Sequence, residues 1–187
     1  MKARYCAGNA ATASSFIKIE ENAVYEVPFT QKTEDDIKHM KHRIENERLK
    51  PELKYSDIKL GFGGINDIEF TAQLYQMKEG GKREKLRIPE TVTALHRLGA
   101  FGILRISETT RLVETYLFLS QVRNRLALLG GLPTDTLPED TIRLRTLAIG
   151  LGVVDSKTDK AEERLRGIIQ ERMKEARGIV ERLFWGC

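Results

Sequence analysis

The feature that most constrains the fold is a helical repeat of apolar residues that recurs through most of the chain. From about Thr158 to Trp185 there is no proline, and the only glycines are Gly167 and Gly178. A helix of this length would span roughly 40 Å at 1.5 Å per residue. Its apolar residues fall on one helical face: Leu165, Ile168, Ile169, Met173, Ala176, Val180, Leu183 and Phe184.

The same spacing predicts six earlier helices, which start near Asn9, Thr33, Ile65, Pro89, Ser107 and Pro138. Proline and glycine residues separate these predicted helices, at Pro28, Pro51, Gly80-Gly81, Gly99, Gly130-Gly131, Pro133 and Gly150. Little room is left for a sheet. The predicted fold class is therefore all-α, a bundle of six or seven helices with short loops, forming a single domain over residues 1–187.

The second predicted helix is expected to lie on the surface. Thr33 with Asp36 three residues later forms a capping box, and the highly charged helix that follows ends before Pro51. It carries one apolar stripe, with Ile37 and Ile44 among its members.

Composition limits the possible partners and the location. The chain has 31 basic and 27 acidic residues, and the basic residues are interleaved with acidic ones instead of forming a tract, so nucleic-acid binding rests only on a pI near 9.1.

Cys6 and Cys187 lie at opposite ends, and no apolar run approaches the roughly 20 residues of a membrane helix. We expect a cytoplasmic protein. The opening Met1-Lys2-Ala3-Arg4 runs directly into structured-looking sequence, which suggests a fragment of a longer protein.

A glycine turn precedes the third predicted helix. A short extended piece, Ser56 to Leu60, leads into Gly61, Phe62, Gly63 and Gly64. Exposed backbone N–H groups could hold a phosphate there, but the spacing matches neither known phosphate-loop pattern. A tight turn that brings backbone close to a neighbouring helix is the favoured interpretation.

The helix after this turn is expected to be packed on two sides, because Ile65, Ile68 and Ala72 lie nearly opposite Phe70 and Leu74. A polar stripe between these faces requires hydrogen-bond partners on neighbouring helices. We predict a structural polar network of Glu69, Gln73, Gln76, Arg123 and Arg125, in which Glu69 pairs with one of the arginines. If Glu69 is buried and paired, Glu69→Ala should destabilise the fold by several kcal/mol.

No catalytic or metal-binding set is predicted. Asp57, Asp67 and Glu69 are the only clustered acids that suggest a metal site. Asp67 and Glu69 point about 200° apart on a helix, so capping or helix-dipole interactions are expected for Asp67. His39 and His42 lack a third ligand. The Phe184-Trp185 pair is interpreted as core, with an exposed docking element as the alternative.

The stretch from Asp57 to Phe70, followed by Gln73, resembles the D-[IV]-K-x-G-x-G-G-I-x-[DE]-I-E-F-x-x-Q signature of the glutamine synthetase adenylyltransferase (GlnE) family. Residues 122–126, 135–138 and 176–186 are similar to later segments of the C-terminal half of these enzymes, and Lys2-Ala3-Arg4 with Gly8 is similar to the exit from their catalytic domain. Phe62 and Asn66 depart from the family pattern, where proline and arginine are common.

The resemblance implies the helical domain that follows the C-terminal nucleotidyltransferase domain. Family catalysis uses a Gly-Ser loop and an Asp-x-Asp pair that holds Mg²⁺ for AMP transfer from ATP to a tyrosine of glutamine synthetase, and this chain has neither motif. No cofactor is expected in this chain, whereas ATP and magnesium are expected for the whole enzyme. The implied partners are the upstream nucleotidyltransferase domain, glutamine synthetase and a PII protein.

Two alternatives remain open at this point. The chain could be a stand-alone all-α interaction module descended from that family, which an upstream Gly-Ser and Asp-x-Asp domain in the same reading frame would exclude. It could also bind nucleic acid, which salt-sensitive retention on a phosphate-bearing resin would support.

Overall fold

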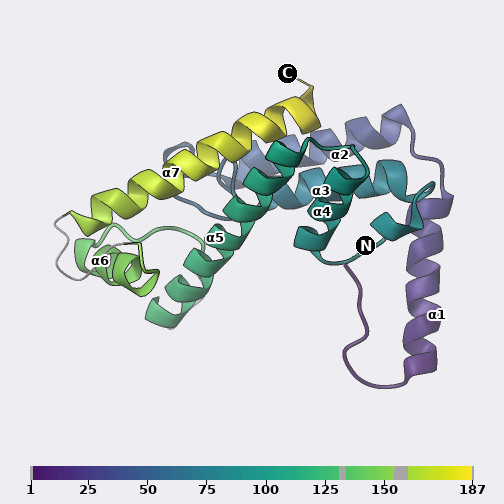
Figure 1. Ribbon diagram of the computed structural model, residues 1–187, viewed down its shortest axis with the longest axis horizontal. Helices are drawn as coiled ribbons and strands as arrows, with labels where there is room; N and C mark the ends of the chain where they lie inside the picture. Colours follow the sequence, from purple (N-terminus) through teal and green to yellow (C-terminus); the bar gives the residue numbers. More distant parts are fainter. Residues whose placement is uncertain (1, 131–133, 154–159, 187) are drawn as a thin grey trace.

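The computed structural model describes residues 2–130, 134–153 and 160–186, and these residues form seven α-helices with no strand (Figure 1). The predicted all-α fold is confirmed. The helices are α1 (Ala10–Glu21), α2 (Gln31–Arg43), α3 (Ile65–Gly80), α4 (Thr91–Ala100), α5 (Ile106–Gly130), α6 (Thr141–Gly150) and α7 (Ala161–Val180). Three helices continue into five-residue π-helical turns: α1 into Asn22–Glu26, α2 into Ile44–Arg48 and α7 into Glu181–Trp185.

Capping side chains set several helix starts. Asn9 caps α1 as expected, accepting a hydrogen bond from the backbone N–H of Thr12. The predicted capping box at Thr33 is wrong, because Thr30 caps α2 and its hydroxyl accepts the N–H of Thr33. Similarly, α4 and α6 begin two and three residues after the prolines predicted to open them, and Asp140 caps α6.

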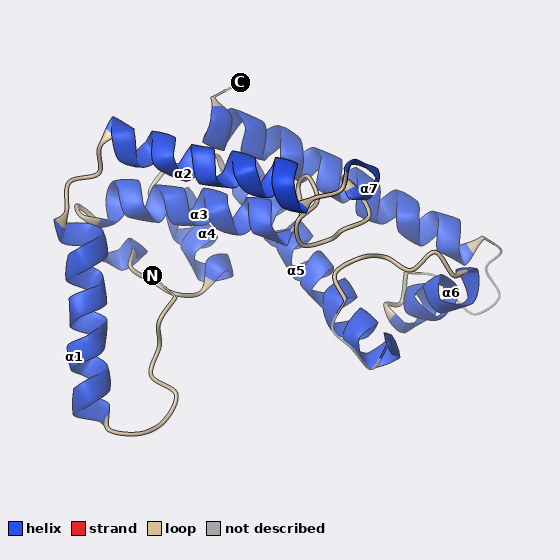
Figure 2. Cartoon of the chain, turned by 180° about the vertical axis from the view of Figure 1, so that it is seen from behind, coloured by secondary structure: helices blue, strands red, loops and turns tan. Residues whose placement is uncertain are grey.

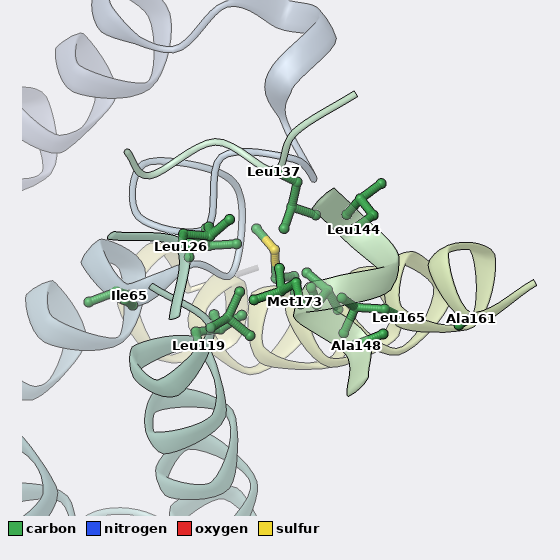
Figure 3. Close-up of a cluster of buried hydrophobic side chains, with 13 residues drawn as sticks. Ile65, Leu119, Leu126, Leu137, Leu144, Ala148, Ala161, Leu165 and Met173 are labelled. Carbon is green, nitrogen blue, oxygen red and sulfur yellow. The ribbon is translucent and has the colours of Figure 1, made fainter. Parts of the chain in front are cut away.

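Two clusters of buried apolar residues form the core. The first lies where α5, α6 and α7 meet, and Figure 3 shows side chains such as Ile65, Leu119, Leu144 and Leu165 converging there. The second lies among α3, α4, α5 and the C-terminal part of α7, and includes Ile68, Leu95, Leu112 and Val180. The helices α5 and α7 contribute to both clusters, and Tyr116 packs against both.

The N-terminal part of the chain contributes little to this core. No fully buried member of either cluster precedes Ile58. Helix α1 has no buried residue and projects away from the other helices in both views (Figures 1 and 2). Helix α2 instead runs beside α3 across the back of the bundle (Figure 2).

Helix α3 is packed on more than one side, as the sequence predicts, against α4, α5 and α7. The expected extended piece before it is only partly extended. Residues 56–60 form turns, with an isolated antiparallel bridge between Asp57 and Thr136.

Several expectations lie outside the described residues: the stop at Gly131, the loop starting at Pro133, the start of the last helix near Thr158, and Cys187. Within the described ranges, no helix combines the length and apolarity needed to cross a bilayer.

Candidate functional site

The glycine turn is pressed against the backbone of α7. Gly63 has a φ of +72°, and a Cβ atom at this position would lie 1.8 Å from the carbonyl oxygen of Met173. At Gly61 a Cβ would lie 2.2 Å from the carbonyl oxygen of Asp57. The close backbone approach predicted from the sequence is therefore what the structure shows, and it fixes the turn, including Gly64, between residues 54–59 and α7.

Internal hydrogen bonds occupy the backbone donors that a phosphate would need. The N–H groups of Ile65 and Asn66, at the start of α3, donate to the carbonyls of Ile58 and Lys59 at 3.0 and 2.9 Å. Gly64 N–H donates to Gly61 O at 2.9 Å, and Gly63 N–H donates to Asp67 Oδ2 at 2.7 Å. The turn is closed on itself, which argues against phosphate binding there.

Asp67 is the centre of a buried group of four charges, which we call the charge cluster: Lys41, Glu45, Asp67 and Arg177. Lys41 and Asp67 are fully buried, and Glu45 and Arg177 are 8% and 9% exposed. Lys41 Nζ lies 2.5 Å from Asp67 Oδ1 and 2.9 Å from Glu45 Oε1. Arg177 Nη1 donates to Asp67 Oδ2 at 3.0 Å and to Glu45 Oε1 at 2.7 Å.

The charge cluster joins four parts of the chain. Lys41 comes from α2, Glu45 from the π-helical turn after α2, Asp67 from α3 and Arg177 from α7. Through Asp67 Oδ2 the cluster also holds Gly63. Its two cations match its two anions, as burial of charge requires.

The surroundings favour the charged forms of Glu45 and Arg177. Burial works to raise the pKa of Glu45, but the hydrogen bond from Arg177 and the positive charge of Lys41 outweigh it and lower that pKa. For Arg177, burial works against the cation, but Glu45, Asp67 and Glu181 raise its pKa. Its guanidinium carbon also lies 4.2 Å from the centroid of the Phe62 ring. Phe62 thus provides a stacking surface for Arg177.

Glu69 lies outside this cluster and is only half-buried. Its Oε1 atom accepts hydrogen bonds from Lys2 Nζ at 2.7 Å and from the Tyr116 hydroxyl at 3.1 Å. Burial raises the pKa of Tyr116, which keeps the hydroxyl protonated as a donor. The expected pairing of Glu69 with an arginine of the central helix is not what the structure shows. Tyr116 is the α5 residue that reaches Glu69, and Arg123 lies two turns, about 10 Å, further along that helix.

Among the described residues, the other members of the predicted polar network form no hydrogen bond or ion pair with Glu69 or with one another. Gln76 is buried, and its Nε2 donates to the carbonyls of Leu86 and Ile88 at 2.7 and 2.8 Å, so that it fixes the α3–α4 connection. Gln73 is half-buried, with no side-chain hydrogen bond recorded within the described ranges.

The two arginines of that network lie on α5. Arg123 Nε donates to Asp135 Oδ1 at 2.5 Å, beside the bridge at Asp57. Arg125 is exposed. The five residues therefore do not form one network.

No grouping of at least three His, Cys, Asp or Glu side chains suitable for a metal occurs in residues 2–130, 134–153 and 160–186. His42 shares a hydrogen bond with the Asn46 side chain at 3.0 Å and lies edge-on to Trp185. Phe184 is buried, in agreement with its interpretation as core. Asp67 and Glu69 point to different partners, as their helical spacing predicts.

Three members of the charge cluster were not predicted from the sequence: Lys41, Glu45 and Arg177. One signal was present for Lys41: it falls between Ile37 and Ile44 on the apolar stripe of α2, where a charged side chain must find a buried partner. Nothing in the local pattern pointed to Arg177, which lies 110 residues from Asp67. The expectation of a surface helix was wrong at Lys41 and Glu45.

Comparisons with known proteins match most of the chain. The family model described as GlnD PII-uridylyltransferase matches residues 31–184. The chain is 36% identical to a bifunctional glutamine synthetase adenylyltransferase/adenylyl-removing enzyme of Stenotrophomonas maltophilia (strain K279a) over 83% of its length, and 32% identical to one of Bifidobacterium longum (strain DJO10A) over 100%. It covers 16% and 17% of those two proteins, about a sixth of their length. The family description names a uridylyltransferase and the relatives are adenylyltransferases, but both are nucleotidyl-transfer enzymes.

Proposed function

Because the chain belongs to the family of the GlnD PII-uridylyltransferase model, as a helical domain of the glutamine synthetase adenylyltransferase type, we propose that it braces a nucleotidyltransferase domain. In this function it supports transfer of AMP from ATP to a tyrosine of glutamine synthetase and supplies no catalytic residue itself. The partners are the preceding nucleotidyltransferase domain and glutamine synthetase. The site of action is cytoplasmic.

The observation that carries this proposal is the position of the N-terminal segment. Lys2-Ala3-Arg4 is similar to the exit from the catalytic domain in the family, and Lys2 is held by Glu69 of the signature and by the hydroxyl of Thr91. A hollow of about 520 Å³ beside this contact is lined by Lys2, Arg4, Pro89, Glu90, Thr91, Val92 and Tyr116. Glu69 fastens this N-terminal segment to α3, which supports a bracing function towards a preceding domain.

Asp67, the second acidic residue of the signature, has a different set of partners. Its carboxylate oxygens are already engaged by Lys41, Arg177 and the N–H of Gly63. Two cations at this carboxylate would repel a divalent ion. The residues present therefore do not fit a Mg²⁺ site, which supports placing ATP and magnesium on the nucleotidyltransferase domain.

The test measures AMP transfer to glutamine synthetase by three mixtures: this chain alone, the nucleotidyltransferase domain of the Stenotrophomonas maltophilia relative alone, and both together. We expect no transfer by the chain alone and a faster rate with both than with the catalytic domain alone. Lys2→Met should reduce that increase, and Lys18→Met, a change on the projecting helix α1, should not. Transfer by this chain alone, or no increase on mixing, would contradict the proposal.

A further inference from the structure

We propose that α2 and its π-helical turn, residues 31–48, form a detachable lid over Asp67 and Arg177, held closed by the charge cluster and able to open while both apolar clusters stay intact. This inference concerns the chain itself and does not depend on the proposed function.

The lid is attached almost entirely through charge. Its only buried residues are Lys41 and Glu45. Ile37 packs against the second apolar cluster but is only half-buried. An additional ion pair, Lys78 Nζ to Glu34 Oε2 at 3.1 Å, is partly exposed. No fully buried apolar side chain joins residues 31–48 to the rest of the molecule.

Apolar anchors lie just outside the lid on each side. Tyr25 is 8% exposed, and its ring packs on Gly80, where a Cβ would lie 2.5 Å from the ring. Leu49 is 5% exposed. The buried side chains of Tyr25 and Leu49 can remain in place while the segment between them moves. They therefore mark the two ends of the part of the chain that detaches.

The free energy of detaching a segment held by ion pairs differs from that of detaching a segment held by apolar contacts. When a buried apolar face separates, it is exposed to water and loses its transfer free energy. When buried ion pairs separate, each group regains its hydration, which offsets much of the lost Coulomb attraction. The lid also carries the (i, i+4) pairs Glu34–Lys38, Lys41–Glu45 and Arg43–Glu47, so it can stay helical when detached.

Opening would uncover the most specific part of the sequence. Asp67 and Arg177 lie directly beneath Lys41 and Glu45, and Asp67 holds Gly63 of the glycine turn. The ring of Phe70, 5.7 Å from Lys41 Nζ, would also be exposed. The lid therefore controls solvent access to Asp67 and to its pairing with Arg177 of α7.

The test is backbone hydrogen exchange followed by mass spectrometry on the whole chain. Residues 31–48 should exchange at least about tenfold faster than the centres of α5 and α7. Lys41→Met should raise exchange in residues 31–48 by about a hundredfold, because it leaves the buried carboxylates short of one cation. Exchange in α5 and α7 should not change. Glu45→Gln is a milder second variant with the same expected pattern.

Two control variants complete the experiment. Lys38→Met, on the same helix but in a partly exposed pair, should change exchange by no more than about twofold. The double variant Lys41→Met/Asp67→Asn removes one charge of each sign and keeps an oxygen for Gly63, so exchange should return to within about tenfold of the unsubstituted chain. Equal exchange of α2 and α7 in the unsubstituted chain, or an equal rise in all segments with Lys41→Met, would overturn the proposal.

Discussion

At the scale of single residues, Asp67 and Glu69, the two acids of the signature that lie on α3, differ in burial and therefore in their expected effect on stability. Asp67→Ala leaves Lys41 and Arg177 buried with one carboxylate fewer, and should lower the free energy of unfolding by about 3–5 kcal/mol. Glu69→Ala removes a half-buried pair with Lys2, whose side chain is 43% exposed, and should cost no more than about 1 kcal/mol. Urea unfolding of both variants measures these values. The sequence led us to expect a loss of several kcal/mol for Glu69→Ala. From the structure we expect a loss of this size for Asp67→Ala instead.

Gly63 should be the least replaceable glycine in the turn. In Gly63→Ala the positive φ and the clash with the Met173 carbonyl act together, and we expect a loss of at least about 3 kcal/mol in unfolding free energy. Gly178 is the matched control, because it is helical and has open space around its Cα. Gly178→Ala should stabilise the chain by about 0.5–1 kcal/mol. Comparable effects of the two substitutions on the melting temperature would be inconsistent with the close contact.

At the scale of the helices, lowering the pH should detach α2 from α3 and α7. The charged groups facing Glu45 are Lys41, Asp67 and Arg177, with Glu181 beyond Arg177. The pKa of Glu45 is lowered in the folded chain, so its stabilising contribution is complete above the unfolded pKa of about 4.3 and is lost as pH falls through the lower folded value.

Trp185 can report this release, because it is the only tryptophan and lies beside His42 of α2. In a His42→Gln background, which removes the imidazole ring beside the indole, its fluorescence should change below about pH 4.3. The same transition should be absent in Glu45→Gln. A transition of the same size in both proteins would assign the signal to another group.

Local patterns predicted the helices well and their contacts poorly. The spacing of apolar residues along the chain predicted the helices α3, α5 and α7, and the glycines of residues 61–64 predicted the turn before α3. Capping was misassigned at Thr33 because Asp36 three residues later resembles a capping box, whereas the observed cap, Thr30, has no acid at that spacing. The charge cluster joins residues 41, 45, 67 and 177, so no pattern within one segment could reveal it. Glu69 was paired with the wrong helical position because the register of α3 against α5 depends on packing.

At the scale of the whole molecule, α5 and α7 run through both apolar clusters, so the bundle should unfold as one unit and behave as a single domain. Leu165→Ala, in the first cluster, should cost about 2–5 kcal/mol. Trp185 packs against the second cluster. Its fluorescence should nevertheless report the same shifted midpoint as the loss of helix measured by circular dichroism. Two separate midpoints would show that the clusters unfold independently.

The signature segment should hold the bundle together through the ion pair between its Asp67 and Arg177 of α7. The most direct measurement is a double-mutant cycle of Asp67→Ala and Arg177→Ala, with unfolding free energies from urea titration. We predict a coupling energy of about 1.5–3 kcal/mol, near the upper end for residues in one ion-pair network. Additive effects of the two substitutions would contradict the claim.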